Sequence, residues 1–264
     1  IPVNKKNFTW KINLNLTHYK NKITYLPDEK KTTVMDGHGG YMNGSRYYGE
    51  DLPINTWYMK RFAGLSEDGL SLWYYTDKET NEEKTTTTYS TGDFYLCGDP
   101  NPDLYGGFGT SITFHGFDLS TQFSYLVGGL TYDYGYAGMM GNPTATSVGN
   151  RWHKDVLKAW SPENPSSTIP RWYFNDLNTT GSSDRFLIDG SYLNLQNIQV
   201  GYTLPDSWTS HLKIKNLRLY FVCDNVYYWS KRKGLDPRRS ISGVGTSGKI
   251  APFRTYSGGI SLQF

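Results

Sequence analysis

The 264-residue sequence has few cysteines, no long apolar run and almost no net charge. Cys97 and Cys223 are its only cysteines, and their spacing matches no metal or redox motif, so we expect both to be unpaired. No apolar run approaches the ~18 residues that a membrane-spanning helix needs, which excludes a helical membrane protein. The 27 basic and 24 acidic residues give a net charge of +3 and form no basic stripe, which argues against a nucleic-acid partner.

Motifs for catalysis and for metal binding are also lacking. The five histidines are scattered and lie in no metal motif: His18, His38, His115, His153 and His211. Glu82-Glu83 and the pair Asp99/Asp103 have the residue types of a hydrolase, but no histidine or nucleophile pattern supports them. The spacing of Asp99 and Asp103 matches no calcium loop, and a plain turn is the simpler interpretation. We therefore predict that the chain is not an enzyme and binds no metal or cofactor.

Aromatic residues and glycine are abundant instead. Phe, Trp and Tyr make up 16% of the chain, and 28 residues are glycine. An excess of Tyr and Trp is typical of the aromatic girdles at the two interfaces of a membrane. The strands of a membrane barrel need only about 9–11 residues, with apolar and polar residues alternating, so the low mean hydropathy of −0.58 is compatible with one. A Tyr-rich soluble all-β binding protein would have a similar composition.

Two segments show the two-residue period of a β-strand most clearly. From residue 8 to residue 17, five apolar residues alternate with polar ones, among them Lys11, Asn13 and Asn15. Such polar groups are costly inside a soluble sandwich, whereas the wet lumen of a barrel solvates them. In the last segment, residues 253–264, the apolar face ends on an aromatic residue. We predict that this is a terminal strand for barrel insertion, carried by Tyr256, Ile260, Leu262 and Phe264; a strand of a soluble sandwich is the alternative.

The whole chain reads as about eight strands joined alternately by long and short connections. The other strands are expected at residues 54–63, 70–76, 108–114, 119–133, 191–204 and 217–224. A change of phase near Gln196-Asn197 predicts a β-bulge in the strand at 191–204. The short connections (66–69, 115–118 and 205–211) would all lie at one end, which is typical of outer-membrane barrels. The inward residues are too small and polar to fill a narrow interior, so we expect a wider barrel that is only partly represented.

The longest connection, residues 134–189, is the main candidate for ligand binding. It far exceeds the ~12–15 residues usual for an unstructured loop, and loops of this length commonly bind or gate. A short helix is predicted at residues 155–160. Four aromatic residues are candidates for contact with a ligand or a lid: Trp152, Trp160, Trp172 and Tyr173. The alternative is that each of them packs the loop against its neighbours.

Several segments, in order, resemble a known family. They are Asn7-Phe8-Thr9-Trp10, Asn101-Pro102-Asp103 with Gly106-Gly107-Phe108-Gly109, Trp160-Ser161-Pro162-Glu163-Asn164-Pro165, Ser191-Tyr192-Leu193-Asn194-Leu195-Gln196-Asn197-Ile198 with Gly201-Tyr202-Thr203-Leu204-Pro205, and Gly234-Leu235-Asp236-Pro237. Through nearly the whole chain, their order and spacing are similar to the C-terminal portion of SusC/RagA-type TonB-dependent outer-membrane transporters of the Bacteroidetes.

The resemblance implies an all-β fold in which this chain supplies roughly the last eight strands of a 22-stranded transmembrane antiparallel barrel. Residues 1–264 would be the C-terminal part of the barrel domain, and the plug, the TonB box and the earlier strands are absent from this chain. No signal peptide is present and Ile1 is not an initiator residue, so we expect a piece of a longer protein.

The resemblance also implies a location in the bacterial outer membrane and a function. The function would be TonB-dependent import of a bulky nutrient, a glycan or an oligopeptide, with a SusD-like surface lipoprotein as the lid. The further implied partners are TonB, the remainder of the barrel and its plug, membrane lipid, and a second copy in a dimer of transporter–lipoprotein pairs. A passive porin or a surface adhesin without energy coupling is the alternative.

Overall fold

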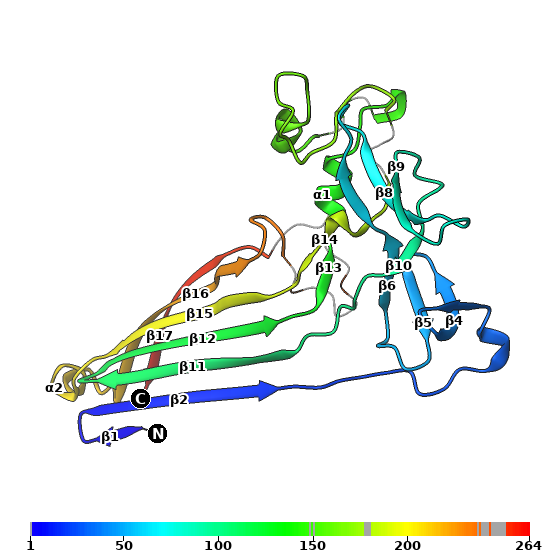
Figure 1. The fold of residues 1–264 in the computed structure, drawn as a ribbon. Helices are drawn as coiled ribbons and strands as arrows, with labels where there is room; N and C mark the ends of the chain where they lie inside the picture. Colours follow the sequence, from blue (N-terminus) through cyan, green and yellow to red (C-terminus); the bar gives the residue numbers. More distant parts are fainter. Residues whose placement is uncertain are drawn as a thin grey trace.

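The computed structural model describes residues 2–147, 149, 151–176, 181–236, 238, 243 and 252–264. Seven antiparallel strands, all of them long except the three-residue β1, form a curved sheet, which we call the wall (Figure 1). In spatial order they are β1 (Val3–Lys5), β2 (Phe8–Thr17), β11 (Leu104–Phe114), β12 (Phe117–Val127), β15 (Tyr192–Thr203), β16 (Asn216–Ser230) and β17 (Thr255–Gln263). No helix in these described ranges is long and apolar enough to cross a membrane.

A second body, the outer unit, projects from one end of the wall (Figure 1). Its five-stranded sheet has the order β10 (Phe94–Leu96), β6 (Thr56–Lys60), β5 (Arg46–Gly49), β4 (His38–Asn43) and β3 (Thr33–Met35). A three-stranded sheet contains β7 (Phe62–Leu65), β8 (Ser71–Thr76) and β9 (Glu83–Thr86). Strands β13 (Leu130–Tyr132) and β14 (Leu187–Asp189) pair with each other and continue the wall strands β12 and β15 into the outer unit.

Short helices occupy the connections. Helix α1 (Tyr134–Met139) lies in the outer unit, and α2 (Asp206–Thr209) lies at the opposite end of the wall. The 3-10 turns are Asp28–Lys30, Ala145–Ser147, Lys154–Lys158, Asp184–Phe186 and Ser210–Leu212. The turn at Lys154–Lys158 matches the short helix predicted for 155–160, whereas α1 lies in the same connection and was not predicted.

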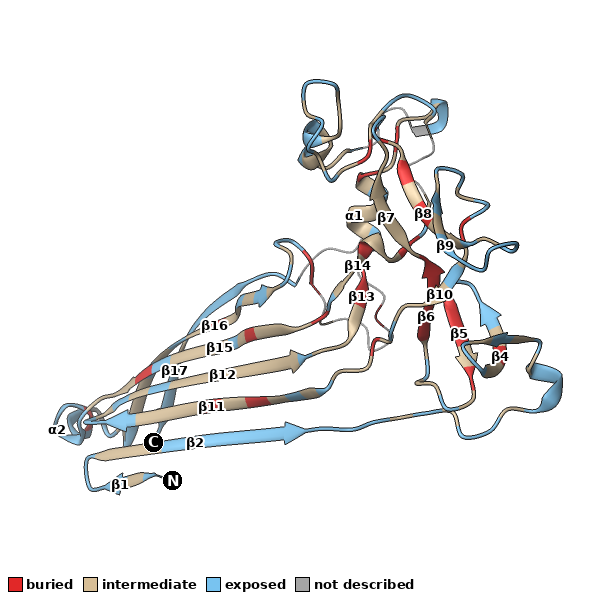
Figure 2. Ribbon diagram, in the orientation of Figure 1, coloured by how far each residue is buried: buried red, intermediate tan, exposed pale blue. Residues whose placement is uncertain are grey.

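The wall has one apolar face and one polar face. The cross-strand register aligns Leu14 of β2 with Phe108 of β11, Phe123 of β12 and Leu195 of β15, so the apolar residues of successive strands share a face. That face is open: Leu14 is 70% exposed and Leu262 is 49% exposed, and no second sheet packs on it among the described residues (Figure 2). A soluble sandwich would bury these side chains between two sheets, so the structure does not support that alternative.

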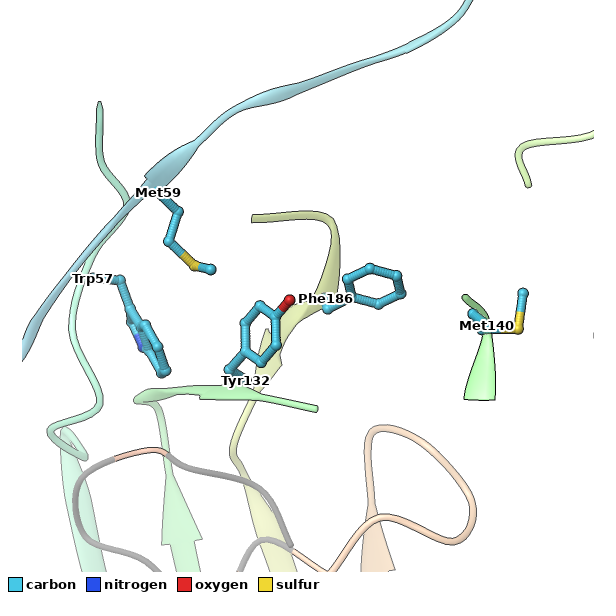
Figure 3. Close-up of a cluster of buried hydrophobic side chains, with 5 residues drawn as sticks. All are labelled: Trp57, Met59, Tyr132, Met140 and Phe186. Carbon is cyan, nitrogen blue, oxygen red and sulfur yellow. The ribbon is translucent and has the colours of Figure 1, made fainter. Parts of the chain in front are cut away.

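The hydrophobic core lies in the outer unit instead. Trp57, Met59, Tyr132, Met140 and Phe186 form a buried cluster contributed by β6, β13, the end of α1 and the turn before β14 (Figure 3). The Trp57 indole N–H donates to the Leu130 carbonyl oxygen at 3.2 Å, which ties the cluster to the strand that rises from the wall. The outer unit is therefore packed like an ordinary soluble domain, while the wall is not.

A buried lysine fastens one loop to this core. Lys60 is 4% exposed, and its ammonium group donates to the carbonyl oxygens of Tyr89 at 2.6 Å and Gly92 at 2.5 Å. Burial lowers the pKa of Lys60. Carbonyl dipoles replace water around the charge, so the ammonium group holds residues 89–92 against β6.

Tight connections gather at the wall end that carries α2. Between β11 and β12 the two turn residues are His115 and Gly116, with φ of 46° and 87°, as a two-residue type I′ hairpin requires. The turn between β1 and β2 lies beside it, because the His115 N–H donates to the Asn7 carbonyl oxygen. Strand β1, which was not among the predicted strands, is the edge strand of the wall.

The predicted hairpin at residues 54–76 does not belong to the wall. Its turn, residues 66–69, lies with the outer loops, since the Gly69 carbonyl oxygen accepts from the Arg171 N–H. Strands β6, β7 and β8 belong to the sheets of the outer unit. The prediction that all three short connections lie at one end is therefore wrong for this one. The physical reason is that these strands lack a two-faced pattern: all five residues of β6 are buried.

Two finer predictions are confirmed. In β15 the register with β12 shifts between Asn197 and Leu195, so Gln196 is the extra residue of a bulge. Both cysteines are free, and Cys223 is buried at 7% exposure, with Tyr256 as its cross-strand partner on the apolar face.

Candidate functional site

The polar face of the wall carries side chains that bridge neighbouring strands. The amide nitrogen of Asn13 lies 3.4 Å from the amide oxygen of Gln122, although β11 runs between their strands. The residue between them is Gly109, where an added Cβ would lie 2.3 Å from the Gln122 oxygen and 2.5 Å from the Asn13 oxygen. Further along the same row, the Asn197 amide donates to Asp224 at 2.6 Å. These side chains form a hydrophilic row, the amide row, whose polar groups bond to one another.

Closer to the tight turns, a charged pair also bridges two strands across a glycine of the strand between them. Arg218 of β16 donates two hydrogen bonds to Asp118 of β12, at 2.9 and 2.6 Å, across the intervening β15. The pair passes over Gly201, where a Cβ would lie 2.5 Å from both partners. The Tyr220 ring lies over Gly259 of β17, and the Arg218 guanidinium is 5.1 Å from that ring. Glycines thus let large side chains lie flat, which leaves the polar face smooth.

A recess of about 560 Å³ opens where the wall meets the outer unit. Its ring-bearing lining residues are Tyr19, Tyr105, Tyr125, Tyr192, Pro100 and Pro102. Gly128 and Gly129 form its rim with φ of 80° and 74°, a conformation that other residues adopt only with strain. A concave surface with several phenol groups suits a ligand that offers both flat apolar faces and hydroxyl or amide groups.

One arginine of this recess is held in place by its own neighbours. Arg238 donates to the Asp236 carboxylate at 2.8 and 2.7 Å and to the Asn194 side-chain oxygen at 2.7 Å. Asp236 and Asn194 are both buried, at 4% and 3% exposure. The charge of Arg238 is therefore neutralised, and its side chain links the loop after β16 to β15.

The four aromatic candidates in the long connection have different environments. Trp152 and Trp172 meet edge to face, with ring centroids 5.3 Å apart, and the Trp172 indole N–H donates to the Gly141 carbonyl oxygen at 3.0 Å. Trp160 lies apart from them, with its ring against Gly69. Tyr173 is 50% exposed, and the Arg171 guanidinium is 5.5 Å from its ring. The structure thus brings two of the four together and leaves Tyr173 the most open.

Behind these aromatic residues lies a network that anchors the loop. The Tyr136 hydroxyl donates to Asp155 at 3.0 Å, and Arg232 pairs with Asp133, whose side chain is 4% exposed. Burial, together with the hydrogen bond to Asp155, raises the pKa of Tyr136 to about 12. The phenol is therefore neutral at physiological pH and acts as a fixed donor.

Sequence reasoning missed the recess. Tyr105 and Tyr192 lie near the ends of two wall strands, and Tyr19 lies just beyond a third, so they share no motif. The sequence feature that could have pointed to the recess is the pair Gly128-Gly129, which lets the chain turn sharply at its rim. No group of three or more His, Cys, Asp or Glu side chains gathers within the described residues. Asp99 instead accepts the Asn101 backbone N–H at 2.8 Å, which closes a turn.

Known proteins match this chain over nearly all of its length. No family model matches. TonB-dependent receptor P3 of Formosa agariphila is 28% identical over 99% of this chain and 27% of its own length. TonB-dependent receptor SusC of Bacteroides thetaiotaomicron is 26% identical over 100% of this chain and 25% of its own length. The chain thus spans about a quarter of these relatives. A solved structure of the RagAB peptide transporter superposes with a TM-score of 0.81 at 23% identity, over 99% of this chain and 28% of that one.

An antiparallel wall with an open apolar face and a hydrophilic opposite face defines the class: part of a β-barrel that spans a membrane. The chain is homologous to a portion of the TonB-dependent receptors, SusC among them, and such receptors reside in the bacterial outer membrane. Because these relatives are receptors and not enzymes, they confirm the prediction that the chain is not an enzyme.

Proposed function

We propose that the chain is part of the wall and mouth of a TonB-dependent importer that moves a bulky nutrient across the outer membrane. The observation that carries the proposal is the two-faced wall, combined with homology to TonB-dependent receptors along almost the entire chain. The apolar face would contact lipid, and the amide-rich polar face would line a water-filled lumen. The nutrient would be a glycan or an oligopeptide.

In this proposal residues 1–264 form the C-terminal part of the barrel domain. Both edges of the wall, β1 and β17, have one strand neighbour each among the described residues, so each edge offers backbone groups to a further strand. Other strands and a plug would complete the barrel, and TonB would act on the plug. A SusD-like lipoprotein would close the mouth, in a dimer of transporter–lipoprotein pairs.

The outer unit would form the mouth. Its packed core and the Lys60 and Arg238 anchors support a rigid scaffold, whereas Tyr173 and neighbouring Phe174 are 50% and 60% exposed. Exposed rings offer large contact area to a sugar ring or a peptide at low entropic cost. We propose Tyr173 as the outermost contact for ligand or lid, with Trp152, Trp172 and Trp160 behind it. In and just after β17, the last strand of the chain, an apolar face would guide insertion into the membrane. Its residues are Tyr256, Ile260, Leu262 and Phe264.

The test uses the full-length receptor expressed with its partner lipoprotein. Removing residues 136–189 would also remove Tyr136, Met140 and Phe186 from the core region, so point variants are sharper. We expect Trp152→Ala/Tyr173→Ala to lower uptake or lid docking at least about tenfold, the size of one lost aromatic contact. The matched control is Trp208→Ala, an aromatic residue 66% exposed at the tight-turn end. Equal uptake by both variants would refute the role of these loop residues.

A separate experiment tests whether uptake depends on energy supplied through TonB. Uptake by the wild-type receptor is measured in cells with and without TonB. We expect uptake to stop without TonB, because import against a gradient needs work that the wall itself cannot supply. Undiminished uptake without TonB would instead support the passive porin, and surface binding without any uptake, with or without TonB, would support the adhesin.

A further inference from the structure

A second cavity, of about 460 Å³, opens where β17 departs from β16. The two strands pair only as far as Asp224 and Thr255, although β16 continues to Ser230. The described residues just before β17, 252–254, do not continue this pairing, and the Asn225 side chain donates to the Phe253 carbonyl oxygen at 3.1 Å. Residues 225–230 therefore form one side of a gap, and Pro252 and Arg254 form part of the other.

The lining of this gap is strongly basic. Lys233, Arg238 and Arg254 line it, and no Asp or Glu does so among the described residues. Arg238 is neutralised by Asp236, but Lys233 and Arg254 take part in no ion pair with a described residue. Among the described residues, Arg254 donates a hydrogen bond to the Tyr256 hydroxyl at 3.5 Å. Two uncompensated cations thus face one cavity, and that arrangement favours an anion.

The gap adjoins the apolar face of the wall. Tyr227 and Trp229 line it and are each 48% exposed, and Tyr256 beside Arg254 is 62% exposed. The cross-strand register pairs Leu195 with Tyr227 and Leu193 with Trp229, so both rings share the face of the exposed leucines. Tyr and Trp at the end of an apolar face mark the depth at which lipid headgroups begin. Cations just beyond such rings lie at the level of headgroup phosphates.

We propose that this gap binds a phosphate-bearing lipid headgroup from the membrane leaflet that meets the loop end of the wall. Arg254 and Lys233 would hold the phosphate, and Tyr227 and Trp229 would pack against the first segment of the acyl chains. Charge complementarity and the continuity with the lipid-facing surface favour a lipid over a soluble anion. The proposal rests on the membrane orientation of the apolar face and not on the transported nutrient, so failure of import leaves it intact.

The experiment uses the full-length receptor, purified in detergent and then exposed to diphosphorylated lipid A. Native mass spectrometry counts the bound lipid molecules on the wild type, on Lys233→Gln/Arg254→Gln and on the control Lys6→Gln/Lys215→Gln. The control removes two exposed lysines at the tight-turn end. We expect the first variant to lose affinity about tenfold or more, because each basic residue at a membrane surface contributes of the order of a factor of five. The control should bind like the wild type.

Three results would overturn the proposal. The first is equal retention of lipid A from which the phosphates have been removed, since the phosphate would then not be recognised. The second is equal loss in both double variants, which would indicate a non-specific charge effect. The third is full competition by millimolar inorganic phosphate, which would identify a site for soluble anions. The single variant Arg254→Lys keeps the charge and should retain most of the binding, which separates the effect of the charge from the effect of altering residue 254.

Discussion

At the scale of single residues, glycine decides which side chains can lie flat on the polar face. Gly258 and Gly259 are neighbours in β17 and point to opposite faces. A Cβ at Gly259 would lie 2.4 Å from the Tyr220 ring, whereas at Gly258 the nearest atom is a backbone oxygen at 3.9 Å. We expect Gly259→Ala to lower the free energy of unfolding by about 1 kcal/mol, because Tyr220 must leave its place beside Arg218. Gly258→Ala should be neutral or slightly stabilising. Urea titration of the full-length receptor in vesicles measures both, and equal effects would contradict the explanation.

A second residue-scale prediction concerns thiol reactivity. Burial, with a smaller contribution from Asp184, raises the pKa of Cys97 to about 11. Because the folded pKa lies above the unfolded value, the stability of the folded state does not change with this thiol below about pH 8.5. Stability is then lost as pH rises from about 8.5 toward 11, where the unfolded thiol ionises and the buried one stays neutral. We expect Cys97 in a Cys223→Ser background to react with iodoacetamide at pH 8 about a hundredfold more slowly than a free thiol. Reaction at the rate of an unfolded control would show that the site is open.

At the scale of elements, the long wall strands could be predicted from the sequence together with their two faces. In the outer unit, the strands expected at 54–63 and 70–76 exist as β6, β7 and β8 but do not belong to the wall, and β3, β4, β5, β9 and β10 were not predicted. Strand β2 alternates strictly because one side faces an apolar medium and the other faces water, so its pattern is visible in the sequence. Strand β6 is buried along its whole length and has no period to detect. The amide row on the polar face of the wall cannot be predicted from the sequence either, because Asn13, Gly109 and Gln122 become neighbours only through the pairing of three strands. Of the candidate site, the aromatic residues of the long loop stay a prediction from the sequence. The tyrosine recess could not be predicted, because its tyrosines come from or next to four different strands, β2, β11, β12 and β15.

The bulge in β15 offers a test at this scale. Gln196 is the extra residue between Leu195 and Asn197, and it separates the apolar phase of Leu193 and Leu195 from that of Ile198 and Val200. Deleting Gln196 would turn one of these sets toward the polar face. We expect the deletion to abolish membrane insertion, measured as loss of heat-modifiable migration in a gel. Gln196→Ala keeps the residue count and should insert normally. Normal insertion of the deletion variant would show that the bulge does not set the register.

At the scale of the whole molecule, the outer unit and the wall cover their apolar side chains in different ways. The outer unit buries Trp57, Met59 and Phe186 in a core of its own, and it should resist proteolysis as a soluble domain does. Among the described residues no buried hydrophobic cluster forms in the wall, which satisfies its polar groups through strand pairing and the amide row. It therefore depends on the membrane to cover its apolar face.

That dependence gives the most decisive prediction. Leu14 and Asn13 are adjacent in β2 and lie on opposite faces, and Leu14 is 70% exposed. If the apolar face contacts lipid, Leu14→Arg should cost about 2–4 kcal/mol near the middle of the bilayer, because the charge cannot be solvated there. Asn13→Arg places the same charge on the polar face and should cost less than about 1 kcal/mol. Urea unfolding of the full-length receptor in phospholipid vesicles compares the two variants. A larger loss for Asn13→Arg would reverse the assignment of the faces, because the side with the amide row would then be the one in contact with lipid.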